Sequence, residues 1–408
     1  MGMHGGGRFA LADASPVFLF RIPGMSIPIY LDSHATTFVE PRVLEEMLPY
    51  FGEQSGNPSS PEHYHGAAAR AAVDRARQTI ADCLGCIEAR DILFTAGATE
   101  ANNLALVGSW RASSGQKQHF ITTAIEHPSV LATLDYLAAQ GAQVTRVGVD
   151  AWGRVDPDAL RQALRPDTFM VSVMAANNEI GTLQPLAEIG QLCREAGVLF
   201  HCDAAQAVGH EALDVEALQV DFLSFSAHKF YGPKGVGALY RRGTEPTIPL
   251  QPILFGGGQE MGLRSGTLNV PGIVGMAAAL RIARDEMEQE NRRLEKLAAA
   301  IFARLQQAFP AIRRNGSPQH RLARNLSLTL PGVEAAALIQ LLKDRVSFSA
   351  GSACATAKPE PSHVLKAIGL SDEECYQTIR IGLGRAVQDA GAAELLCAGI
   401  AAAPVFLD

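Results

Sequence analysis

The chain has 408 residues, 47% hydrophobic and 19% charged, enough for a large core in two or three domains or in one large unit with a satellite. Its 35 basic and 42 acidic residues give a net charge of −7, which argues against direct nucleic-acid binding and against an anionic membrane surface as the main partner. Seven cysteines, an odd count in so long a chain, do not form a disulfide framework and fit a reducing cytosol.

Residues 1–24 precede the first patterned segment, and we expect a disordered extension or a misassigned start there. Their apolar run VFLF is much too short to span a bilayer and lacks the features of a secretory signal. Nothing else in the sequence reads as a transmembrane segment, so we expect a cytoplasmic protein.

Short apolar runs alternate with helical stretches from about residue 40 to residue 270. This alternation is typical of βαβ units, and it predicts an α/β fold whose mostly parallel sheet is wrapped by helices. The runs expected to form strands are DILFTAG, HFITT, QVTRVGV, TFMVSVM, VLFHCD, FLSFS and VGALY.

The segment ILFTAGATEANNLAL, residues 92–106, indicates a strand, a glycine turn and a helix. Such a turn directs backbone N–H groups, together with the hydroxyl of Thr99, at an anion on the helix N-terminus. Ordinary helix starts use similar turns, so the segment alone leaves both interpretations open.

Asp203 follows the apolar run VLF at the carboxyl end of a predicted strand, the edge at which α/β sheets bind ligands. The carboxylate either caps the next helix or holds the protonated ring nitrogen of pyridoxal 5′-phosphate (PLP). PLP acts as an electron sink only while that nitrogen keeps its proton, and a fixed carboxylate ensures this.

Lys229 lies between two predicted strands in DFLSFSAHKFYGPKGVGALY, residues 221–240, just before a glycine-proline turn. A lysine held there can be partly desolvated, which favours the neutral amine that a Schiff base needs. The alternative is an ordinary solvated loop lysine. Asp203 and Lys229 at neighbouring strand ends together indicate a PLP site.

The glycine-rich segment GGGQEMGLRSGT, residues 256–267, lacks the strand and helix context of a dinucleotide site. Residues 271–312 are strongly helical and link to a region whose strands are NLSLTL, RVSFSA and TIRIGLG. We expect an N-terminal extension (1–24), a large PLP-binding domain (25–270), and a linking helix with a small C-terminal α/β domain (271–408).

The remaining cysteines and histidines predict no metal site. CLGC, with Cys83 and Cys86, ends a helical pattern without a second ligand pair nearby, so we expect a structural role. His63 and His65 lie in a glycine- and proline-rich segment and are expected to pack within a loop.

From about Tyr30 to about Arg385 the chain resembles the cysteine desulfurases of the fold-type I PLP family, which also contains the class V aminotransferases. The motifs that carry the resemblance are YLDSHATT, GNPSSPEHYHG, FTAGATEANNLAL, EHPSV, NNEIGTLQP, HCDAAQ, SFSAHKFYGPKG, RSGTLN, AGSACATAKPEPSHVL and TIRIGLGR. The resemblance implies the PLP-dependent transferase fold and a homodimer.

The resemblance also implies a role for each matching residue. Lys229 would form the Schiff base with PLP, Asp203 would hold the pyridinium, and His127 would stack on the ring and help to move protons. The other residues implied to bind are Gln206 at the phenolic oxygen, Ala98, Thr99, Ser226 and His228 at the phosphate, Thr267 at the phosphate of the neighbouring subunit, Asn178 at the cofactor, and Asn178 and Arg380 at the substrate carboxylate.

Cys354 lies in SFSAGSACATAKPEP, whose small residues and prolines predict a mobile surface loop with an accessible thiol. The alternative is an incidental cysteine. In the family that the chain resembles, the thiolate of the loop cysteine takes sulfur from L-cysteine as a persulfide and leaves L-alanine. The loop then carries the sulfur to an acceptor protein, and the resemblance implies this role for Cys354.

The sequence does not identify the sulfur acceptor. It would serve either iron–sulfur cluster assembly or the thiolation of tRNA, a cofactor or DNA. The C-terminal segment after GLGR is shorter than in housekeeping relatives that feed iron–sulfur scaffolds, which puts that partnership in doubt. The alternative functions are a PLP-dependent aminotransferase, a selenocysteine lyase, and an idle sulfur-carrier scaffold.

Overall fold

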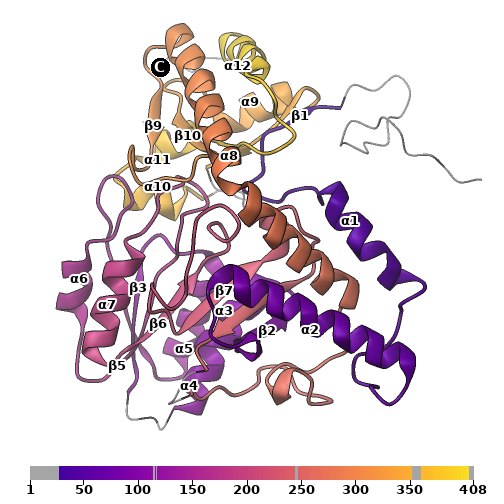
Figure 1. Cartoon of the computed structure of the whole chain (residues 1–408). Coiled ribbons are helices and arrows are strands. Elements are labelled where there is room, and N and C mark those ends of the chain that lie inside the picture. Colours follow the sequence, from indigo (N-terminus) through magenta and orange to yellow (C-terminus); the bar gives the residue numbers. More distant parts are fainter. Residues whose placement is uncertain (1–26, 114, 116, 244–246, 352–359, 404–408) are drawn as a thin grey trace, which may run out of the picture.

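Two main β-sheets, joined by one long helix, organise the chain in our computed structural model (Figure 1). The structure describes residues 27–113, 115, 117–243, 247–351 and 360–403. Two expectations, the extension over residues 1–24 and the loop that carries Cys354, lie outside the described residues.

A 7-stranded sheet forms the centre of the larger part of the molecule, in the order β2-β8-β7-β6-β5-β3-β4. Neighbouring strands from β7 to β4 are parallel, whereas β8 is antiparallel to both β2 and β7. The prediction of an α/β fold with a mostly parallel sheet is confirmed. The strands are β2 (Ile92–Thr95), β3 (His119–Thr123), β4 (Gln143–Val147), β5 (Thr168–Ser172), β6 (Leu199–Asp203), β7 (Phe222–Ser226) and β8 (Gly237–Arg241).

Helices cover both faces of this sheet, and alternate residues of a strand therefore enter different cores. In β2, Ile92 and Phe94 pack with α2 and α8, whereas Leu93 packs with α3 and α5. The helices of this part are α1 (Pro41–Met47), α2 (Tyr64–Leu84), α3 (Ala98–Asn103), its continuation through a π-helical stretch at Leu104–Gly108 into α4 (Ser109–Ala112), α5 (Pro128–Ala139), α6 (Pro157–Ala163) and α7 (Leu186–Ala196).

Helix α8 (Val270–Ala308) connects the two parts, as the helical pattern over residues 271–312 predicts (Figure 1). At 39 residues it is about 58 Å long. Its first half packs Ile273, Met276 and Leu280 into the core of the larger sheet, and its second half packs Ile301 and Leu305 into a separate core. One rigid element therefore takes part in both cores.

The smaller sheet is antiparallel, with the order β12-β13-β10-β9. The run RVSFSA, expected as one strand, forms two short ones, β11 (Val346–Ser347) and β12 (Ser349–Ala350), which pair in different sheets. The other elements are β9 (Arg313–Asn315), β10 (Asn325–Thr329), β13 (Thr378–Gly382), α9 (Ala335–Leu342), α10 (His363–Ala367), α11 (Asp372–Tyr376) and α12 (Gly391–Ala402).

The N-terminal strand β1 (Ile29–Tyr30) pairs in parallel with β11, so the described chain starts beside the C-terminal elements (Figure 1). Asp32 then bridges to Gly382 at the end of β13. From there the chain crosses to the larger sheet, where the Thr37 N–H donates to the carbonyl of His228 at 2.9 Å. Residues 32–37 thus lie between the two sheets.

Within the described ranges, no helix is both long and apolar enough to cross a membrane. No group of three or more histidine, cysteine or acidic side chains among the same residues is placed to hold a metal ion. The six cysteines of the described chain are all free, and burial raises the pKa of both Cys83 and Cys86.

Candidate functional site

A pocket of about 930 Å³ opens at the carboxyl ends of the parallel strands and brings together side chains from both parts of the molecule. The predicted site residues that line it are Ala98, Thr99, His127, Asn178, Asp203, Gln206, Ser226, His228, Lys229 and Arg380. Thr267, expected to reach a neighbouring subunit, is exposed and does not line the pocket of its own chain. Cys354 lies outside the described residues.

Lys229 ends a short 3₁₀ turn (Ala227–Lys229) that directly follows β7. Its Nζ donates to the backbone carbonyls of His34 and Ala35, both at 2.8 Å. Burial, then the positive charges of Arg324 and Arg380, lowers the pKa of this lysine to about 8. The interpretation of Lys229 as an ordinary solvated loop lysine is therefore wrong.

Asp203 is the last residue of β6 and is only 5% exposed. Its Oδ1 accepts from the N–H of Ala205 at 3.0 Å. This is the local side-chain-to-backbone contact that the helix-capping interpretation predicts. Its Oδ2 accepts from the side-chain amide of Asn102, on α3, at 2.8 Å. The carboxylate is therefore fixed in direction while it lines the pocket.

His127 is the N-cap of α5, and its Nδ1 accepts from the N–H of Ser129 at 3.1 Å. The ring proton therefore lies on Nε2 in the neutral form. Burial lowers the pKa of His127 despite the opposing charge of Asp203, so the neutral form is favoured near pH 7.

One end of the pocket combines the first turn of α3 with the end of β7. Ala98 and Thr99 begin α3, and Ser226 and His228 lie opposite them. A Cβ on Gly237 would approach the Cα of Gly97 to 2.6 Å, so glycine lets β8 pack directly against the turn. The N–H groups of the first turn of α3, two hydroxyls and the nearby Lys234 make this end suited to an anion.

Arg380 reaches the pocket from β13 and is 3% exposed. One guanidinium nitrogen donates to Asp32 Oδ1 at 2.8 Å, and another to the backbone carbonyl of Asn178 at 3.3 Å. Nε has no partner among the described residues. Asp32 therefore orients a cation whose fork suits a substrate carboxylate.

Gln206 is held by residues that the sequence did not single out for this role. Its Oε1 accepts from Arg324 at 2.8 Å and from His34 Nδ1 at 3.0 Å, and its Nε2 donates to the carbonyl of His34 at 3.0 Å. Asn102 was missed in the same way. Neither an asparagine inside a helix nor an arginine before a strand carries a local signal of such contacts.

Two buried acids beside the pocket were also missed. Burial raises the pKa of Glu126 to about 8 and that of Glu179 to about 7. Glu179 lines the pocket and accepts from the hydroxyl of Ser362 at 2.5 Å. Glu126 precedes His127 and accepts from Thr123 at 2.7 Å, while its Oε2 has no partner in the described chain.

The chain is similar to known proteins over most of its length. The family model for class V aminotransferases matches residues 29–395. The cysteine desulfurase IscS of Anaeromyxobacter dehalogenans (strain 2CP-C) is 49% identical over 361 residues, which cover 88% of this chain and 89% of that protein.

Solved structures extend the similarity to the fold. A NifS-like protein superposes with a TM-score of 0.84 at 37% identity, over 92% of this chain and 98% of that one. SspA in complex with cysteine gives a TM-score of 0.76, also at 37% identity, over 87% of this chain and 98% of that one.

Proposed function

Because the chain belongs to the class V aminotransferases and, within them, to the cysteine desulfurases, which are PLP-dependent enzymes, we propose that the pocket around Lys229 holds PLP and L-cysteine. The structure of SspA with cysteine supports the choice of substrate. The observation that carries the proposal is the pairing of a desolvated lysine with a fixed carboxylate at adjacent strand ends.

The residues present fit PLP group by group. Asp203 is an acceptor for the pyridine N–H, and Gln206 offers an amide donor for the phenolic oxygen. The residues proposed for the phosphate are Ala98, Thr99, Ser226 and His228, joined by Thr267 from the neighbouring subunit. The ring of His127 would cover one face of the PLP ring. Together these groups make the proposed site suited to a flat, anionic cofactor.

Bound PLP supplies an electron sink for bonds broken next to the substrate α-carbon. Arg380 and Asn178 would hold the substrate carboxylate and thereby fix which bonds face the ring. Lys229, with a pKa of about 8, exists in both protonation states near neutral pH and is suited to move a proton. His127, neutral near pH 7, is a second proton carrier.

Cys354 is proposed to receive the sulfur. Its thiolate forms a bond to the substrate sulfur while the carbon–sulfur bond breaks and the electron pair stays on carbon, where a proton completes alanine. The persulfide then passes to an acceptor protein, for iron–sulfur cluster assembly or for thiolation of tRNA, a cofactor or DNA.

We infer further that the enzyme works as a homodimer, since Thr267 is exposed outside its own pocket. The free state of the six described cysteines supports a reducing compartment such as the cytoplasm.

The proposal is tested with the purified full chain, supplied with PLP, L-cysteine and a reductant, by measuring alanine and sulfide. Cys354→Ala should lower sulfide release at least about a hundredfold, because no other thiol takes the sulfur. Cys397→Ala, which removes a half-buried thiol on α12, is the matched control and should behave as wild type.

The same assay separates the alternatives. Sulfide release at the wild-type rate from Cys354→Ala would remove this cysteine from the mechanism. Formation of a keto acid in place of alanine would instead identify an aminotransferase.

A further inference from the structure

Arg324 is a buried cation that no carboxylate neutralises within the described residues. It lies in the turn before β10 and is 1% exposed. One guanidinium nitrogen donates to Gln206 Oε1 at 2.8 Å and another to the backbone carbonyl of Lys229 at 3.1 Å. Burying a charge without a counter-ion is costly, so its position calls for a functional explanation.

The first consequence concerns the direction of the Gln206 amide. A guanidinium can only donate, so the amide oxygen must face Arg324 and the NH₂ group must face away from it. One of the two N–H bonds goes to the carbonyl of His34. The second remains for the pocket, which Gln206 lines.

The second consequence concerns His34. Its Nδ1 must donate to the same amide oxygen, which leaves Nε2 to accept from the side-chain amide of Asn325 at 3.2 Å. Burial, followed by the charge of Arg324, lowers the pKa of His34 well below its usual value, so the ring is neutral. Arg324 and its chain neighbour Asn325 thus determine one hydrogen-bond network under the pocket.

The third consequence is electrostatic. Charged or titratable groups face Arg324 and Lys229 from every element around them. They are Asp32 and His34 in the crossing segment, His127 at the start of α5, Asp203 on β6, His210 after it, His228 beside Lys229, Tyr231 after the turn, and Arg380 on β13. His210 is buried and neutral, and its Nε2 donates to the carbonyl of Lys229 at 2.9 Å.

Among these groups, Arg324 contributes more to lowering the pKa of Lys229 than Arg380 does, and only burial contributes more than Arg324. The pKa of Arg324 itself is lowered to about 10 by burial, which still leaves it protonated near pH 7.

We propose that Arg324 is a positioning residue for the reaction, which fixes the Gln206 amide as a donor toward the phenolic oxygen of PLP and anchors the peptide carbonyl of Lys229. This inference rests on the proposed function, which supplies PLP as the ligand. The effect of Arg324 on the lysine amine is present in the protein without cofactor and can therefore be measured independently.

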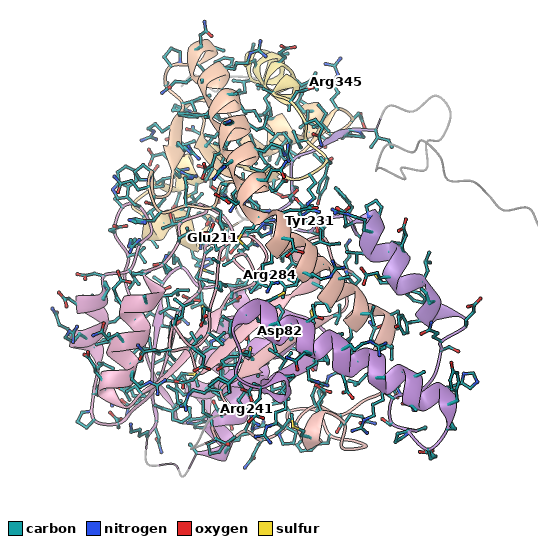
Figure 2. The ribbon with its side chains drawn as sticks, in the orientation of Figure 1. Asp82, Glu211, Tyr231, Arg241, Arg284 and Arg345 are labelled. Carbon is teal, nitrogen blue, oxygen red and sulfur yellow. The ribbon has the colours of Figure 1, made fainter. Side chains whose placement is uncertain are left out.

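Three full-length variants test the proposal: Arg324→Met, Arg324→Lys and Arg241→Met. Arg241 is the matched control, because the Nε atoms of Arg324 and Arg241 are both buried without a partner in the described chain, and Arg241 donates to a backbone carbonyl. It ends β8 and lies well away from Tyr231, which follows the Lys229 turn (Figure 2).

The first measurement is the reactivity of Lys229 in cofactor-free protein with acetic anhydride, read by peptide mass spectrometry between about pH 6 and pH 9, a range that brackets its pKa. Arg324→Met should lower labelling at neutral pH roughly threefold to tenfold, because loss of the positive charge raises the pKa of the lysine. Arg324→Lys keeps the charge and should stay within about twofold of wild type.

The second measurement is PLP affinity, titrated by the visible absorption of the bound cofactor. The dissociation constant should rise roughly tenfold in Arg324→Met and roughly fivefold in Arg324→Lys, because an ammonium does not make both fork contacts. Arg241→Met should match wild type in both measurements.

Wild-type labelling profile and wild-type PLP affinity in Arg324→Met would overturn the proposal. Should that variant not fold, wild-type PLP affinity in Arg324→Lys would overturn it. If the wild-type protein itself bound no PLP, the proposed function would fail, while the labelling profiles would still decide whether Arg324 controls the lysine.

Discussion

The two sheets contribute to the pocket in different ways. The larger sheet supplies Asp203 and Lys229 at the ends of adjacent strands β6 and β7. The smaller sheet and its flanking turn supply Arg380 and Arg324, two buried cations. The groups proposed to react thus come from the parallel sheet, while the cations proposed to orient and tune them come from the antiparallel one.

The difference follows from the geometry of the two sheets. Parallel strands end at one common edge, so residues that follow neighbouring strands lie close together. The cations from the smaller sheet reach that edge through packing between the two parts, in which α10 places Val364 and Leu365 against Ile125, Met174 and Ile180 of the larger part. The proposed catalytic groups and the proposed tuning charges therefore have separate structural origins, and each can be perturbed alone.

Removal of Lys229 should have the largest effect, because it takes away the reactive group from the parallel sheet. We expect Lys229→Ala to lower alanine formation at least about a thousandfold while the protein still folds. Lys366→Ala, on the exposed side of α10, is the control. More than about a tenth of wild-type activity in Lys229→Ala would remove this lysine from the chemistry.

Loss of the carboxylate that orients Arg380 should affect substrate binding more than turnover. Asp32 accepts from Arg380 and, through Oδ2, from the hydroxyl of Ser349 at 2.8 Å. In Asp32→Asn we expect KM for cysteine to rise roughly tenfold and kcat to change less than threefold, because the guanidinium loses its main acceptor.

Ser349→Ala tests whether Asp32 acts through Arg380, since it removes only the second contact of the carboxylate. Its KM should stay within about twofold of wild type. Equal rises of KM in both variants would mean that Asp32 acts by supporting β12 and not by orienting the arginine.

Glu126 should have the smallest effect on turnover and instead change how stability depends on pH. Its pKa rises from 4.5 to about 8 on folding, so the native state keeps a proton that the unfolded chain releases. The resulting stability is complete below about pH 4.5 and is lost as pH rises through about 8.

Glu126→Gln should flatten that slope by up to about 1 kcal/mol per pH unit in urea unfolding followed across this window. Glu188→Gln, an exposed acid on α7, is the control. An unchanged slope in Glu126→Gln would show that this acid is ionised in the folded protein.

Local pattern was sufficient for the strands of the larger sheet, for the helix α8 and for the residues that follow strand ends. Lys229 and Asp203 belong to this group, since each lies directly after a short apolar run in a stretch that alternates with helices. RVSFSA was predicted as one strand and forms two, because β11 pairs with β1 and β12 pairs with β13. That choice depends on partners more than 300 residues apart in the case of β1, which local pattern does not contain.

The sequence by itself determined the α/β class, the parallel sheet and the pairing of a lysine with an aspartate at one edge, because strand periodicity and strand ends are local properties. Only the tertiary structure decided that Asn102 holds Asp203, that Asp32 orients Arg380, and that Arg324 lies beneath Gln206 and Lys229. Each of these contacts joins residues far apart in the chain. Burial then gives the charges and hydrogen bonds their strength, and burial exists only once both cores have packed.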